Sequence, residues 1–195
     1  MPSSTDDLEL RGVSVLFLAT VFVQFLRQKL GTLYGHGCAP FCNKDAKDCP
    51  QRQEFSGEAM GDARPYDFDQ HELREAGKGL ICPRDGKMGC AYVDYLATLL
   101  QGFVGHADVM ISYTWGYSIL SIGSALMAWC ERDGRDPSTT YVWICCMCIN
   151  QHRVAGTTVS TEFLKNEFET RVKGIGHVVS LLSPFAKPVN LTRSW

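Results

Sequence analysis

The sequence lacks the features that mark several large classes of protein. It has no excess of charge of one sign, because 19 Lys and Arg stand against 21 Asp and Glu, a net charge of −2. This balance gives no overall attraction for phosphate backbones or anionic lipid, so we do not expect nucleic acid as a partner. The sequence also contains no G-x-x-x-x-G-K-[ST] phosphate loop and no G-x-S-x-G nucleophile elbow. Function must therefore be sought in other residue patterns.

A hydrophobic run long enough to span a bilayer is absent as well. The segment from Val13 to Leu26 is apolar, but it is short and is interrupted by three polar residues. A signal peptide is disfavoured because Asp6, Asp7 and Glu9 precede the segment, where a leader carries positive charge. We interpret the segment as a helix that packs in a core, and we expect no membrane span.

The nine cysteines do not form the pattern of a disulfide scaffold. Their number is odd, and Cys145, Cys146 and Cys148 crowd one apolar run, where thiols behave as small apolar side chains. A reducing compartment suits such a chain, so we predict a cytoplasmic location.

A metal site is the main competing chemistry. Four potential zinc ligands lie close together in a loop-rich region: His36, Cys38, Cys42 and Cys49. A tetrahedral zinc ion would organise a segment that has so little core of its own. The spacing lacks the paired C-x2-C knuckles of standard zinc fingers, so we predict no metal site and keep zinc as an alternative.

Three short apolar runs in the second half of the chain alternate with stretches of helical periodicity. The runs are Asp108 to Tyr113, Tyr141 to Ile149 and His177 to Ser183, and the helical stretches are Ser118 to Arg132 and Thr161 to Lys173. This βαβαβ order predicts an α/β domain over residues 105–195 with a flavodoxin-like parallel sheet and right-handed crossover helices. Such a sheet binds ligands beyond the carboxyl ends of its strands, which is where we place the candidate site.

Residues 1–104 are expected to form a helical and loop-rich N-terminal extension. We predict a helix over about residues 8–30, an irregular segment over residues 35–79 that is rich in Gly, Pro and Asp, and a helix over about residues 91–103. The last of these places Val93, Leu96 and Leu100 on one helical face.

In this order the pieces resemble a divergent TIR-like domain of the kind found in protists and algae. The matching pieces are ADVMISYTWGYSI for the first strand and its tip, YVWICCMCINQH for the second, and HVVSLLSPFAKPVNLTRSW for the third. WICCMCINQ is also similar to the W-I-D-x-x-C-I-N-Q signature of fungal heterokaryon-incompatibility domains. The resemblance covers about Gly105 to Trp195, with a weaker likeness in ICPRDGKMGCAYVD before it.

The resemblance implies a pocket for NAD. TIR-like enzymes cleave the bond between nicotinamide and ribose with a glutamate that follows the third strand in a Trp-Cys-x-x-Glu motif. Trp195 matches the tryptophan of that motif, so we expect the domain to be incomplete at its C-terminus, without a catalytic residue in this chain. The implied nucleotide contacts are Thr114, Trp115, Asn150, Gln151 and Ser183.

Each of these residues has a structural alternative. Trp115 could stack on nicotinamide or adenine, or it could cap the core beneath its loop. For Asn150 and Gln151 we favour fixing of the loop over a bond to a ribose hydroxyl. His152 has no visible carboxylate partner, so we do not assign it a role in proton transfer.

The sequence thus supports two functions of different classes. The first is a TIR-like nucleotide-binding and signalling module, with NAD hydrolysis only in a protein that supplies the glutamate. Cys145 or Cys146 stands where the family often has an aspartate, which removes a charge and weighs against catalysis. The second is a non-catalytic domain that self-associates through the loop after Ile149 and the helix from Thr161. A third reading is a truncated gene product with no function of its own.

Overall fold

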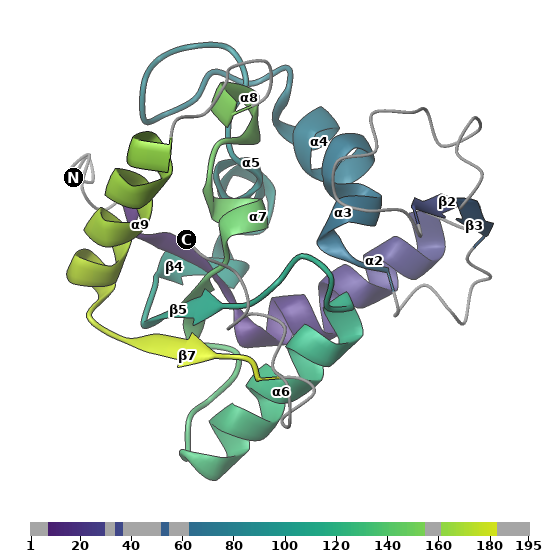
Figure 1. The fold of residues 1–195 in the computed structure, drawn as a ribbon, viewed down its shortest axis with the longest axis vertical. Coiled ribbons are helices and arrows are strands. Elements are labelled where there is room, and N and C mark those ends of the chain that lie inside the picture. Colours follow the sequence, from purple (N-terminus) through teal and green to yellow (C-terminus); the bar gives the residue numbers. More distant parts are fainter. Residues whose placement is uncertain (1–7, 30–33, 37–51, 55–62, 155–160, 183–195) are drawn as a thin grey trace.

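β5 (Val109–Ser112) lies between two parallel neighbours in a five-stranded mixed sheet. It pairs with β6 (Tyr141–Trp143) on one side and with β7 (Val178–Ser180) on the other, and the strand order of the sheet is β4-β1-β6-β5-β7. The three predicted strands are therefore present and parallel, in the spatial order second, first, third. The computed structural model describes residues 8–29, 34–36, 52–54, 63–154 and 161–182 (Figure 1).

Two helices connect these strands. α6 (Ile119–Arg132) leads from β5 to β6, and α9 (Thr161–Ile175) precedes β7, so both predicted helices are confirmed. The Ser118 hydroxyl accepts a hydrogen bond of 3.1 Å from the Ser121 amide and caps the first turn of α6. Right-handed crossovers that move in opposite directions along a sheet place their helices on opposite faces. α6 and α9 accordingly lie on opposite sides of the sheet (Figure 1).

The second strand is shorter than predicted. β6 ends at Trp143, and the chain then forms a helical turn, α7 (Cys145–Cys148), where the prediction of a strand through Ile149 is wrong. The Cys148 amide donates to the Ile144 carbonyl oxygen at 2.9 Å, so a local bond replaces the ladder. An apolar run of this length does not distinguish a buried strand from a buried helical turn. A second short helix, α8 (Gln151–Val154), follows.

The N-terminal apolar segment begins as a strand, so the prediction of one helix over about residues 8–30 is wrong. β1 (Arg11–Ser14) precedes a π-helical segment, η1 (Phe17–Val21), and α2 (Phe22–Lys29). β1 runs antiparallel between β4 and β6, and Gly12 permits this approach because a Cβ there would lie 2.7 Å from the Val142 carbonyl oxygen. The Ser14 hydroxyl accepts a hydrogen bond of 3.1 Å from the Phe17 amide, which favours the change from strand to helix.

The expected N-terminal extension supplies a second strand to the same sheet. β4 (Val104–His106) pairs with β1 at one edge. It follows α5 (Tyr92–Leu99) and a 3-10 turn, η5 (Gln101–Phe103), so the predicted helix over about residues 91–103 is an α-helix only in its first part. Strands from both sides of residue 104 therefore share one sheet.

Residues 35–79 are not irregular throughout, which corrects another prediction. β2 (Tyr34–His36) and β3 (Arg52–Glu54) form a separate antiparallel pair. Further along, the chain is helical through α3 (Pro65–Phe68), η4 (Asp69–Arg74) and α4 (Glu75–Gly77). The physical reason is that Phe68 and Leu73 are buried, and the Phe68 ring lies edge-on to Phe22 at a centroid distance of 5.3 Å.

The apolar N-terminal segment packs in the core, as interpreted from its sequence. Val13, Phe17, Phe22 and Leu26 are each at most 2% exposed. Across the described ranges, no helix combines the length and the apolar character needed to cross a membrane.

Close packing of α6 on η1 generates a test of the fold. A Cβ on Gly123 would lie 2.8 Å from the Cα of Ala19, so Gly123→Val should lower the free energy of unfolding by about 1–3 kcal/mol through overpacking. Urea unfolding monitored by circular dichroism measures the change. Ser124→Val, at the exposed neighbouring position of the same helix, is the matched control and should alter stability by about 0.5 kcal/mol or less. Equal stabilities of the two variants would contradict the packing.

Candidate functional site

Four of the five predicted site residues lie where the parallel strands end. Thr114 and Trp115 directly follow the β5 region, and Asn150 and Gln151 follow α7, which continues from β6. The fifth, Ser183, lies outside the described residues. The structure therefore allows a test of whether the first four meet.

Trp115 and Gln151 meet at Cys145. The Trp115 Nε1 donates to the Cys145 Sγ at 3.2 Å, and the Gln151 Nε2 donates to the Cys145 carbonyl oxygen at 3.2 Å. The Tyr113 hydroxyl lies 3.4 Å from the same sulfur. Cys145 thus joins the end of β5 to the segment after β6, a role that the sequence did not reveal beyond its position in place of an aspartate.

Cys145, at which these side chains meet, is a neutral thiol. Burial raises the pKa of the Cys145 thiol, and the hydrogen bonds from Trp115 and Tyr113 only partly oppose that shift. Burial also raises the pKa of Tyr113 well above its ordinary value. At neutral pH the Cys145 thiol and the Tyr113 hydroxyl therefore carry no negative charge.

Thr114 is buried and stabilises the turn that follows β5. It is 2% exposed, and its Oγ1 accepts a hydrogen bond of 3.3 Å from the Gly116 amide. Its carbonyl oxygen accepts another, of 3.0 Å, from the Tyr117 amide. The Tyr117 hydroxyl then donates to the Leu181 carbonyl oxygen at 3.4 Å, so this turn also joins the ends of β5 and β7.

Asn150 fixes a loop, which is the role that we favoured for it. Its Nδ2 donates to the Gly89 carbonyl oxygen at 2.9 Å and to the Cys82 Sγ at 3.5 Å, while its Oδ1 accepts from the His152 amide at 3.0 Å. Residues 80–90, which we call the 80–90 loop, are thereby held against the start of α8. The free thiols Cys82 and Cys90 are both buried at the ends of this loop.

Arg153 also binds the 80–90 loop. This residue was not identified from the sequence. Its guanidinium forms a two-pronged ion pair with Asp85, at 2.7 and 3.1 Å, and donates to the carbonyl oxygens of Met88 and Gly89 at 3.0 Å. The hydrogen bonds from Arg153 hold the pKa of the Asp85 carboxyl well below its usual range. Gly89 adopts a φ of +88°, and a Cβ there would lie 2.8 Å from the His152 ring, so loop and helix require glycine at this contact.

Beneath the loop lies a buried network of charges that sequence reasoning also missed. Asp94 is 2% exposed and pairs with Arg84 and Arg11 at 2.9 Å each. Arg84 also pairs with Glu9 at 3.2 Å and donates to the Cys148 carbonyl oxygen at 2.9 Å. Burial raises the pKa of the Asp94 carboxyl, and Arg84 and Arg11 oppose that rise.

The network extends to the crossover helix of the third strand. Arg171 of α9 pairs with Glu9 and, at 3.0 Å, with Glu167. Three guanidiniums and three carboxylates therefore balance within it. It links residues before β1, the 80–90 loop, α5 and α9, which are far apart in the sequence.

No metal centre accompanies these charges within the residues that the structure describes. There, no group of three or more His, Cys, Asp and Glu side chains could hold a metal ion. Cys38, Cys42 and Cys49 of the zinc alternative lie outside those residues, and of His36 only the backbone of β2 is described. The zinc hypothesis thus stays untested.

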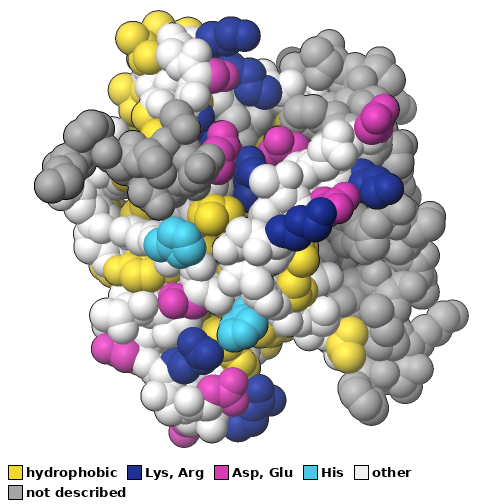
Figure 2. Space-filling model, turned by 90° about the vertical axis from the view of Figure 1, so that its left-hand side faces the viewer, with side chains coloured by type: hydrophobic (Ala, Val, Ile, Leu, Met, Phe, Trp, Pro, Cys, Tyr) yellow, Lys and Arg dark blue, Asp and Glu magenta, His cyan; other side chains and the backbone are white. Residues whose placement is uncertain are grey.

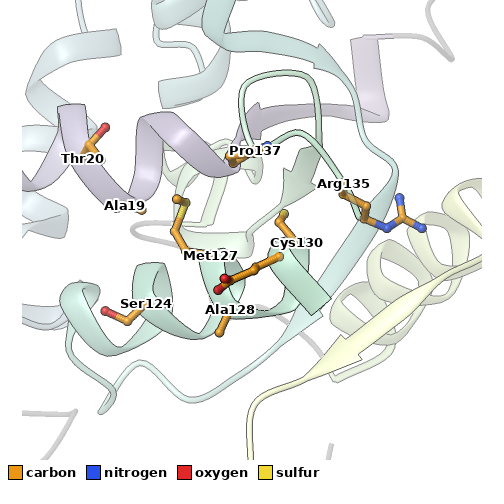
Figure 3. A pocket seen from close by; sticks show the side chains of 9 residues that line it. Ala19, Thr20, Ser124, Met127, Ala128, Cys130, Arg135 and Pro137 are labelled. Carbon is orange, nitrogen blue, oxygen red and sulfur yellow. The ribbon is translucent and has the colours of Figure 1, made fainter. Parts of the chain in front are cut away.

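A pocket away from the strand ends is lined by η1, the second half of α6 and the turn that follows. Its volume is about 510 Å³, and Met127, Cys130 and Pro137 lie around the space in Figure 3. α6 begins beside the end of β5 and runs back toward the start of β6, so this pocket lies away from Cys145. Its lining combines apolar side chains with the hydroxyls of Thr20 and Ser124 and with the charged side chains of Glu131 and Arg135.

Removing Asp94 should destabilise the protein strongly. Asp94→Asn leaves Arg11 and Arg84 without their shared buried partner, and breaking a buried ion pair costs about 3–5 kcal/mol. Asp133→Asn is the matched control, because its pair with Arg132 is exposed and should contribute about 1 kcal/mol or less. Urea unfolding of both variants measures the difference, and a loss below that of the control would contradict a stabilising network.

The buried thiols should react slowly with alkylating reagents. Burial raises the pKa of Cys148 to about 12 and that of Cys90 to about 11, and the thiolate is the reactive form. In native protein at neutral pH, iodoacetamide should modify these two residues at least ~100-fold more slowly than in guanidinium chloride, where thiol pKa values return to about 8.5. Timed alkylation with peptide mass spectrometry gives both rates. Equal rates would show that the thiols are accessible.

Comparison with protein-family models, with curated proteins and with solved structures finds no match for this chain. The function of the site is therefore argued from its own residues and geometry.

Proposed function

We propose that the chain is a TIR-like nucleotide-binding and signalling module that binds a nicotinamide nucleotide such as NAD without hydrolysing it. In this proposal the ring of Trp115 stacks on nicotinamide or adenine at the carboxyl ends of the parallel strands. The observation that carries it is the meeting of Trp115 and Gln151 at Cys145, which joins the ends of two neighbouring strand segments in one place.

The arrangement of the strands supports the flavodoxin-like, TIR-like form of the fold. The order β6-β5-β7 is second, first, third along the chain, which is how a flavodoxin-like sheet begins. Ligands of such sheets bind where the strand order reverses, here between β5 and β7. Trp115 follows β5 at the carboxyl ends of the strands, and its Nε1 is directed to Cys145, which follows β6.

The chemistry of the edge favours binding over cleavage. Breaking the nicotinamide–ribose bond passes through an oxocarbenium-like state that a carboxylate stabilises. The 195 residues contain no Trp-Cys-x-x-Glu sequence, and the Cys145 sulfur to which the Trp115 Nε1 donates belongs to a neutral thiol. A reducing, cytoplasmic environment fits the proposal, because Cys82, Cys90, Cys130, Cys145, Cys146 and Cys148 are free thiols.

NAD binding should depend on the ring of Trp115. Trp115→Ala is expected to weaken NAD binding about 5- to 150-fold, because a base stacked on an aromatic side chain contributes about 1–3 kcal/mol. Trp115→Phe keeps an aromatic ring and should lose less affinity. Trp129→Ala on α6 is the matched control, because Trp129 packs against Arg135 away from Cys145 and should leave binding unchanged. Isothermal titration calorimetry measures all four proteins.

The same preparations should release no nicotinamide from NAD above the rate without protein, as measured by chromatography. Steady release by the wild-type chain would contradict binding without hydrolysis. Equal NAD affinity of the wild type and Trp115→Ala would contradict the proposed stacking.

We keep homotypic self-association without a nucleotide as the second candidate function, because one observation weighs against a ligand at the strand ends. Polar side-chain groups at the strand ends already form hydrogen bonds within the chain, which leaves fewer of them to bind a ligand. The residues concerned are Thr114, Asn150 and Gln151. Sedimentation velocity over a range of protein concentrations tests this function. It requires a sedimentation coefficient that rises with concentration, and a single monomeric species throughout would rule it out.

A further inference from the structure

The outer edge of β7 has no partner strand in the part of the chain that the structure describes. β7 is the last strand in the order β4-β1-β6-β5-β7, and it runs along the outside of the sheet in Figure 1. An open strand edge presents unpaired amides and carbonyls, and proteins usually protect such an edge with lysine, proline or a bulge. Residues 177–182 read HVVSLL and contain no lysine or proline, so the protection that these residues offer is the short length of β7.

The pairing with β5 defines which backbone groups of β7 face outward. Met110 donates its amide to the His177 carbonyl oxygen, and the Leu181 amide donates to the Ser112 carbonyl oxygen. In a parallel ladder the bonded residues of a strand alternate with residues whose amide and carbonyl point the other way. Val178 and Ser180 therefore present their backbone groups to the open side.

The side chains at this edge are also exposed and uncharged. Val178 is 46% exposed, and Leu182, two positions beyond the strand, is 39% exposed. Val172, on the exposed side of α9, is 39% exposed as well. The side of the molecule that carries α9 and β7 shows hydrophobic side chains interspersed with charged ones (Figure 2).

We infer that a second copy of this chain pairs with β7 in antiparallel orientation, so that two sheets continue across a two-fold axis at Val179. The outward residues Val178 and Ser180 are two apart, which makes the edge complementary to itself. Val178 would pair with Ser180 of the second copy, and Ser180 with its Val178, each pair exchanging both backbone bonds. Val179 would lie opposite Val179 of the second copy.

Register predicts where the side chains go in this pair. Val178, Met110 and Trp143 align across the three parallel strands, so they share one face of the sheet. The Trp143 ring lies edge-on to Phe168 of α9 at 5.8 Å, which identifies that face as the one covered by α9. Val178 would therefore contact Ser180 of the second copy beside α9, and the two Val179 side chains would meet on the α6 face.

The inference rests on the second proposed function, homotypic self-association, and places its interface at β7 instead of the loop after Ile149 and the helix from Thr161. A strand of three residues buries little area, so the dimer is expected to be weak, with a dissociation constant of about 10–1,000 μM. Another occupant of the edge, such as a further segment of the same chain, would give protection that does not change with concentration.

Sedimentation velocity on the full 195-residue chain, with one variant and a matched control, tests the inference. Val178→Lys places a charge on the open edge and should weaken dimerisation at least ~10-fold. Leu99→Lys is the control: Leu99 is 59% exposed at the end of α5, so the same chemical change away from β7 should leave dimerisation unchanged. Circular dichroism checks that both variants fold. Amide hydrogen exchange at Val178 and Ser180 of the wild type should slow as concentration rises.

The possible outcomes distinguish failure of the β7 interface from failure of self-association as a function. A wild type that dimerises equally well as Val178→Lys would overturn the β7 interface and leave self-association standing. A chain that stays monomeric at every concentration would overturn both. Exchange at Val178 and Ser180 that is slow and independent of concentration would show that the chain's own residues cover the edge, and the inference would fail.

Discussion

Neutralisation of the buried Asp94 carboxylate is the constraint on which the arrangement of the domain depends. An unpaired carboxylate at this depth would cost several kcal/mol, so the folded state requires Arg84 and Arg11 beside it. Arg11 lies in β1, Arg84 in the 80–90 loop and Asp94 in α5. The ion pairs of Asp94 therefore hold β1, the 80–90 loop and α5 together without any ligand.

The ion-pair network around Asp94 also contacts the segments that carry the candidate site. Arg84 donates to the Cys148 carbonyl oxygen at the end of α7, and Arg171 connects α9 to Glu9. Asn150 and Arg153 hold the 80–90 loop from α8. These contacts hold the segment from Cys148 to Arg153 against the 80–90 loop, and Cys145, which contacts Trp115, lies in the same helical turn as Cys148.

Sequence periodicity predicted the elements that carry a clear pattern. α6 and α9 repeat apolar residues at helical spacing and begin near Ser118 and Thr161, and the apolar run before Tyr113 forms β5. The run from Tyr141 to Ile149 failed because burial on all sides hides the difference between strand and helix. β1 was missed since its four residues are continuous in sequence with a helical segment, and only pairing with β4 and β6 identifies the strand.

The residues of the candidate site also differ in how far the sequence could predict their contacts. Position at the ends of strands is a matter of chain order, so Trp115 and Gln151 could be predicted to approach each other. Partners that come from distant segments could not be predicted, which is why Arg153, Asp85 and the Asp94 network were missed. A single Arg or Asp in a polar loop carries no periodic signal, and its partner lies 68 residues away in the Arg153–Asp85 pair.

The contrast between two edges of the sheet bears on what the domain does. At the carboxyl edge, the polar groups of Thr114, Asn150 and Gln151 are satisfied within the chain, so a ligand there gains mainly from the surface of Trp115. At the lateral edge, Val178 and Ser180 leave backbone groups without a described partner. The backbone groups of Val178 and Ser180 would exchange water for a protein partner on pairing, so each such hydrogen bond contributes only about 0.5–1.5 kcal/mol net. Pairing at the lateral edge is therefore expected to be weak, and a nucleotide at Trp115 must rely on stacking.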